Sequence, residues 1–201
     1  APNVAEGTRP TLARRRRIGG DGEPEVFCAD EQTSVAIDLG RWRSLAEGVL
    51  LAEGVRGAAE LSVLFVERDV IAELNESYME KTGPTDVLAF PIDAPDVELA
   101  STPGAVSRGP DRAPVDISDL PLLLGDVVVC AAVAAEQAPT HAGTVDDELA
   151  LLVVHGVLHV LDWDHADDEQ RTAMQAREVE LLRDLHWQGD PPPGFRQDHP
   201  E

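Results

Sequence analysis

Three histidines are the residues whose types and spacing are best suited to chemistry. His155 and His159 are four residues apart, and His165 follows six residues later. In a helix, residues at i and i+4 lie on one face one turn apart, so the first two imidazoles can converge. The stretch before them, residues 149–154, is apolar on every face and predicts a buried helix. Buried imidazoles need partners, because an unsatisfied polar group inside a protein costs roughly 1–3 kcal/mol.

A metal ion would supply that partner. Two nitrogens from one helix and a third from the following loop leave one position of a tetrahedral zinc open for water. A set of imidazoles without a thiolate suits a borderline-soft ion. We therefore predict one Zn²⁺ per chain, held by His155, His159 and His165. A histidine pair alone would more often be surface chemistry or core packing, and a structural zinc site would need a fourth protein ligand that the sequence does not obviously supply.

The residues beside the histidines bear on the reaction. The His-x3-His-x5-His spacing is also that of metzincin proteases. In HExxH proteases the glutamate after the first histidine is the general base, but here that position is Gly156, which disfavours a metalloprotease. We expect this glycine to leave space near the metal for a bulky substrate. Asp164, next to a ligand, is a candidate outer partner of the metal or proton acceptor; capping the next helix is the alternative.

The histidines must be positioned by the secondary structure around them, which is predicted as alternating strands and helices. Apolar periodicity predicts strands at 34–39, 60–66, 85–90 and 124–130, and helices at 41–55, 69–80, 131–137, 144–161 and 167–185. This order indicates an α/β or α+β layered fold with about four strands. Asp162 is expected to adopt a left-handed conformation that turns the chain back after the histidine helix.

Three segments lack apolar periodicity and concentrate proline, glycine and charge. They predict a disordered N-terminal arm over residues 1–33, a mobile loop over 92–120 and a flexible tail over 189–201. The remaining residues, 34–188, would form a single domain.

The chain is strongly acidic, with a net charge of −22 and Lys81 as its single lysine. This charge argues against a protein that coats nucleic acid, and a solvated acidic surface is the simpler explanation. The sequence contains no run of about 18 apolar residues, so it predicts no membrane-spanning helix. The Arg14–Arg17 run is not followed by an apolar segment, and the two cysteines form no CxxC pair. We expect a cytoplasmic protein.

Three motifs together resemble those of a known family. The segment His155-Gly-Val-Leu-His-Val-Leu-Asp-Trp-Asp-His165 resembles the HGxLHLxGYDH signature of the YbeY-type endoribonucleases, the rRNA maturation factors. Leu74-Asn75 with Gly83-Pro-Thr-Asp-Val-Leu-Ala-Phe-Pro91 resembles the LN…PTDVLSFP segment, and Leu124-Gly-Asp-Val-Val-Val-Cys130 resembles LGDIVIC. Their order and spacing agree over roughly residues 34–187.

The resemblance implies a fold and a function. The fold would be a compact α+β domain with a mixed sheet of about four strands packed against helices, one of them a metalloprotease-like zinc helix. The protein would hold zinc on the three histidines and act on single-stranded RNA, not DNA or membranes. The family is linked to maturation of the 3′ end of 16S rRNA and to ribosome quality control, so the expected partners are ribosomal RNA and the ribosome or its small-subunit proteins.

The chain departs from the family pattern at several positions. Asp162 and Trp163 replace the glycine and tyrosine of the signature. Many members carry an arginine, proposed to contact RNA, directly after the aromatic residue of the second helix, where this chain has Met79. Lys81 is the nearby cation and our candidate for contact with the substrate. The missing arginine and the acidic charge favour one alternative, a ribosome-assembly factor with little nuclease activity.

Overall fold

The structure, a computed structural model, describes residues 22–92 and 121–197. The predicted loop 92–120 lies outside these residues except for Ile92, as do residues 1–21 and 198–201. In chain order the elements are β1 (Pro24–Glu31), α1 (Leu39–Ala52), β2 (Ala59–Val66), α2 (Arg68–Met79), β3 (Val87–Pro91), β4 (Leu122–Val129), α3 (Ala131–Gln137), the short 3-10 turn η3 (Ala138–Thr140), α4 (Val145–Val160), α5 (Asp168–Leu182) and the π-helical turn η4 (Arg183–Trp187).

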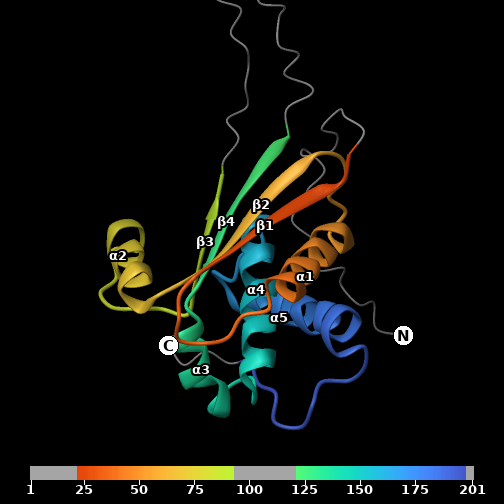
Figure 1. The fold of residues 1–201 in the computed structure, drawn as a ribbon. Coiled ribbons are helices and arrows are strands. Elements are labelled where there is room, and N and C mark those ends of the chain that lie inside the picture. Colours follow the sequence, from red (N-terminus) through yellow and green to blue (C-terminus); the bar gives the residue numbers. More distant parts are fainter. Residues whose placement is uncertain (1–21, 93–120, 198–201) are drawn as a thin grey trace, which may run out of the picture.

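The four strands form one mixed sheet, as predicted. Their order is β1-β2-β4-β3; β1 and β4 both run parallel to β2, and β3 runs antiparallel to β4. Figure 1 shows α1, α4 and α5 gathered on one side of the sheet and α2 set apart on the other. The predicted α+β fold is confirmed.

The main core lies between the sheet and the helices α1, α4 and α5. Alternate residues of β2, including Leu61, Val63 and Phe65, point into it. On β4, Val127 belongs to this core, whereas Val128 packs in a second cluster with Ile71 of α2. Helix α4 is buried along most of its length, in keeping with its apolar sequence. Neither α4 nor any other helix in the described ranges is long and apolar enough to cross a membrane.

Helix α4 begins and ends as its sequence predicts. The Thr144 hydroxyl accepts a hydrogen bond from the backbone N–H of Asp147 at 3.1 Å, which satisfies one of the free donors of the first turn. The first turn is acidic, which the helix dipole favours. Beyond the last turn, Asp162 has φ 69°, the left-handed conformation expected for it. This residue reverses the chain and brings the loop with His165 back toward the helix.

The first strand is not where the sequence analysis placed it. Residues 34–38 form no strand, and β1 lies at Pro24–Glu31, inside the segment predicted to be a disordered arm. All eight residues of β1 pair with β2, from Pro24 with Ala59 to Glu31 with Val66. The inward side chains Val26 and Cys28 alternate with exposed ones. The predicted boundary at residue 33 is therefore wrong. The segment 24–31 is short and contains several acidic residues, and it forms a strand because it pairs with β2, which is distant in the sequence.

The predicted flexible tail is also wrong over residues 189–197, which fold back onto the domain. The Phe195 ring packs edge-on against Trp187, with 4.7 Å between centroids. The backbone N–H of Arg196 donates to the carbonyl of His141 at 3.0 Å. The last predicted helix likewise ends as an α-helix at Leu182 and continues as η4, after which Gln188 turns the chain with φ 54°. Three consecutive prolines restrict the backbone of the returning segment, and Phe195 supplies its apolar anchor.

Candidate metal centre

The three predicted ligands come together in the structure. His155 and His159 project from the last two turns of α4, and His165 projects from the loop that follows. Their candidate ligand atoms all lie within 4.8 Å of one another. The ring centroids are 4.6 Å apart for His155 and His159, 4.8 Å for His159 and His165, and 5.7 Å for His155 and His165. Within the described ranges this is the one group of at least three such side chains close enough to share an ion.

The surroundings of His159 keep its imidazole neutral. Burial, followed by the neighbouring rings of His155 and His165, lowers the pKa of His159 from 6.5 to about 4. Asp164 acts in the opposite direction but does not outweigh these effects. Neutral imidazole is the form that binds a metal, so this residue is in its ligand form at neutral pH.

Glu178 of α5 sets the orientation of the His155 ring. Its Oε1 lies 2.7 Å from His155 Nδ1, and the residue is 3% exposed. An ionised carboxylate only accepts hydrogen bonds, so Nδ1 carries the donated proton and Nε2 is left as the ligand atom. The sequence analysis missed Glu178. A signal for it exists, because this acid falls on the buried stripe of α5 with Met174 and Leu181, where a solvated acid is not expected.

The loop that carries His165 is tied to two helices. Trp163 is buried, and its Nε1–H donates to Glu53 Oε2 at 2.9 Å at the end of α1. The other oxygen of Glu53 accepts from Arg177 Nε of α5 at 2.6 Å. This tie was also missed in the sequence. It gives a structural role to the tryptophan that replaces the tyrosine of the family signature.

Asp164 does not cap the helix that follows it. Its Oδ1 accepts from the backbone N–H of His165 at 2.7 Å, whereas α5 is capped by Asp167, which accepts from the N–H of Gln170 at 2.8 Å. The capping alternative is therefore wrong. Asp164 is exposed and close enough to the triad for its charge to act on His159.

Gly156 serves the packing of α4 and not access to the metal. A Cβ at this position would overlap Cγ1 of Val127 and lie 3.2 Å from its Cγ2. The bare Cα therefore faces β4, where helix and strand approach too closely for a side chain. The expectation that this glycine leaves space for substrate is wrong.

Lys81 belongs to a different part of the fold from the helix and loop that carry the three histidines. It is exposed just beyond the end of α2, where its backbone N–H donates to Asn75 at 3.3 Å. Helix α2 packs on the opposite face of the sheet from α4 (Figure 1). Tyr78 and Met79 at the end of α2 are 68% and 40% exposed.

A buried polar network lies two turns before the triad on α4. Glu148 accepts from His141 Nδ1 at 2.8 Å and from Gln137 Nε2 at 2.8 Å. The same Gln137 amide donates to Asp86, at the start of β3, at 2.6 Å. Hydrogen bonding to Glu148 raises the pKa of His141. This network joins α3, α4 and β3 and holds the strand beside the helix that bears the ligands.

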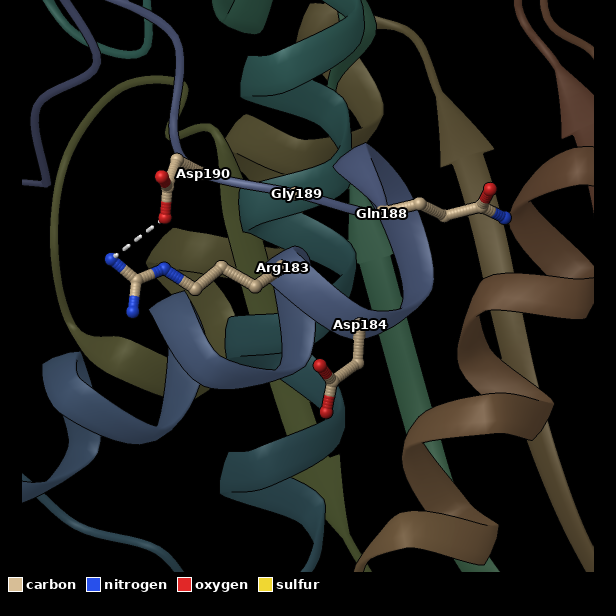
Figure 2. Close-up of a pocket in the computed structure, with 5 residues that line it drawn as sticks. All are labelled: Arg183, Asp184, Gln188, Gly189 and Asp190. Carbon is tan, nitrogen blue, oxygen red and sulfur yellow. Dashed lines mark ion pairs between the residues drawn. The ribbon is translucent and has the colours of Figure 1, made fainter.

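One open pocket lies away from the triad, at the turn after α5. Figure 2 shows Arg183 and Asp190 pointing toward each other, with 3.6 Å between their charged atoms, and Gln188 and Asp184 pointing away from them. Its lining includes none of the three histidines. The pocket marks the place where the chain turns back toward the triad.

The donors present fit a zinc ion. Catalytic zinc sites have three protein ligands, and here three imidazole nitrogens converge from a helix and the loop that follows it. A zinc-binding histidine also commonly donates its other ring N–H to a carboxylate, as His155 does to Glu178. A mixed sheet backed by a helix that bears this triad is the arrangement of a metal-binding domain, and its donor set is the one that metal-dependent hydrolases use.

Comparison with known proteins identifies the family. The family model described as "Endoribonuclease YbeY" matches residues 27–186. The chain is 43% identical over 151 residues to the Endoribonuclease YbeY of Salinispora tropica, covering 75% of this chain and 90% of that protein. It is 42% identical to that of Acidothermus cellulolyticus, covering 79% and 89%. The chain belongs to the Endoribonuclease YbeY family. A Thermotoga maritima protein solved in solution shares 22% identity with a TM-score of 0.47, covering 85% of this chain and 99% of that one.

Proposed function

We propose that this protein is a zinc-dependent endoribonuclease that cuts single-stranded RNA at the centre formed by His155, His159 and His165. The observation that carries the proposal is the convergence of these three side chains, with His155 held by Glu178 at 2.7 Å. One zinc per chain follows from a single triad in the described residues. The biological substrate proposed is ribosomal RNA, at the 3′ end of 16S rRNA and in ribosome quality control, with small-subunit proteins as partners in the cytoplasm.

The roles proposed for the residues follow from their positions. When bound, zinc would acidify a water and polarise a phosphoryl oxygen. Glu178 holds His155 so that Nε2 is presented to the ion, and Trp163 holds the loop of His165 through Glu53. Asp164 is exposed beside the triad and is the proposed proton acceptor.

A second candidate function is a ribosome-assembly factor that binds RNA or protein and cleaves little. Met79 occupies the position of the family's arginine, and the net charge of −22 weakens attraction to a phosphate backbone. Lys81 is the cation nearest in sequence to that position and the proposed contact for RNA.

The test is cleavage of a labelled single-stranded RNA by the purified full chain. We expect cleavage that stops with a chelator, returns with zinc and is absent from a His159→Ala variant. A His199→Ala variant, which removes a histidine outside the described residues, serves as the matched control and is expected to cut normally. Cleavage that survives both the chelator and His159→Ala would refute the proposal, and tight RNA binding without cleavage would favour the assembly factor.

A further inference from the structure

The segment after η4 returns to the metal centre. Residues 189–197 follow the turn at Gln188, and they lie beyond residue 186, where the match to the family model ends. We call residues 189–197 the C-terminal strap. Its last described residue, Gln197, contacts the carboxylate that orients His155.

The contact is a defined hydrogen-bond chain. Gln197 Nε2 donates to Glu178 Oε2 at 2.8 Å and to the carbonyl of Gln175 at 3.0 Å. Both neighbours are acceptors, which fixes the amide with its nitrogen toward them. Glu178 therefore receives Gln197 on one oxygen and His155 Nδ1 on the other, at 2.7 Å.

The strap backbone is anchored independently of the Gln197 side chain. Phe195 packs against Trp187 and the main core, and the N–H of Arg196 donates to His141 at 3.0 Å. The side chain of Arg196 is exposed. Gln197 is thus presented to Glu178 by a docked segment, so its loss need not release the strap.

The energetic reason for a donor here is the burial of Glu178. Glu178 is only 3% exposed, so the oxygen that does not bind His155 has little access to water and needs a hydrogen-bond donor from the protein. Without the Gln197 donor, the Glu178 carboxylate would lower its free energy by rotating toward solvent, where water can bind it. The His155 ring would then lose the hydrogen bond that fixes its orientation. Outer partners of metal ligands typically change metal affinity by 10–100-fold when they are removed.

We propose that Gln197 is a positioning residue of the metal centre, holding Glu178 and through it the ring of His155. The proposal rests on the metal centre proposed above. It assigns the C-terminal strap a part in metal retention that lies outside the segment matched to the family.

The experiment measures zinc affinity of the full chain by competition with a chromophoric chelator. We expect Gln197→Ala to weaken zinc binding by about tenfold, the lower end of the range for outer partners, because it acts through Glu178. The absorption spectrum of the cobalt-loaded variant should also change, since it reports ligand geometry. Arg196→Ala, an exposed neighbour that keeps its backbone bond, should bind as wild type does.

A double-mutant cycle separates positioning from a general effect on folding. In a Glu178→Gln background, Gln197→Ala should cause little further loss of zinc affinity, because the group it holds has already been changed. Wild-type affinity in Gln197→Ala, or an equal loss in both backgrounds, would overturn the role of Gln197. Failure of the wild-type chain to bind zinc would instead overturn the metal centre itself.

Discussion

Gly156 allows a sharp test of how α4 is seated against the sheet. A Gly156→Ala variant adds one methyl group at a position where the structure has no room for it. The new Cβ would overlap Cγ1 of Val127 and lie 3.2 Å from Cγ2. Val127 is fully buried and β-branched, so its side chain has few rotamers into which it could retreat.

The expected magnitude follows from two opposing effects. Adding a methyl group to a packed core costs about 1–3 kcal/mol, whereas replacing glycine by alanine in a helix returns about 0.8–1.0 kcal/mol. Because the overlap is with a buried side chain, we expect the free energy of unfolding to fall by about 1–2 kcal/mol. For a chain of this size that lowers Tm by about 2–8 °C.

The assay is denaturant unfolding of the wild type, Gly156→Ala, Val127→Ala and the double variant. Removing both methyl groups of Val127 should relieve the overlap, so the double variant should be more stable than the sum of the single effects predicts, by about 1 kcal/mol or more. A Gly156→Ala variant that gains about 1 kcal/mol would show that the Cβ fits and refute the packing argument. If the glycine served substrate access instead, the variant would keep its stability and lose only cleavage.

Three further predictions address RNA contact, the His165 loop and pH. Met79→Arg should tighten RNA binding and Lys81→Ala should weaken it, with the log–log salt slope changing by about 0.7 per phosphate contact; equal affinities for all three proteins would place the RNA elsewhere. Glu53→Gln removes the negative charge from a partly buried ion pair and should lower the free energy of unfolding in urea by about 1–2 kcal/mol. It should also speed zinc release to a chelator, because Glu53 holds Trp163 in the loop of His165, and unchanged release would contradict this tie. In the metal-free protein, the pKa of His159 near 4 means that the folded state binds fewer protons than the unfolded state between pH 4 and 6.5. Stability relative to His159→Gln should therefore rise with pH across that window, and a flat difference would contradict the neutral imidazole.

The sequence predicted the parts of the site that are local in the chain. His155 and His159 share a helix face by spacing alone, and the left-handed turn at Asp162 that returns His165 follows from backbone preferences. The mixed sheet and the helix layers also followed from alternating patterns and the family motifs.

What the sequence did not predict depends on contacts between distant residues. The alternating segment that contains Val26 and Cys28 is short and flanked by acids, and it is a strand because β2 pairs with it. Glu178 falls on the apolar stripe of α5, but its partner, His155, lies on another helix and does not follow from the sequence of α5. Gln197 follows three prolines that are typical of a loose tail. The role of Gly156 was predicted wrongly because its neighbour Val127 lies on β4, and the spacing of residues along α4 gives no information about that contact.

The central claim is that His155, His159 and His165 hold one zinc ion. Elemental analysis of protein purified without added metal tests it most directly. We predict about one zinc per chain in the wild type and almost none in a His155→Ala/His159→Ala double variant that remains folded by circular dichroism. No zinc in the wild type, or full zinc retention in the double variant, would contradict the account.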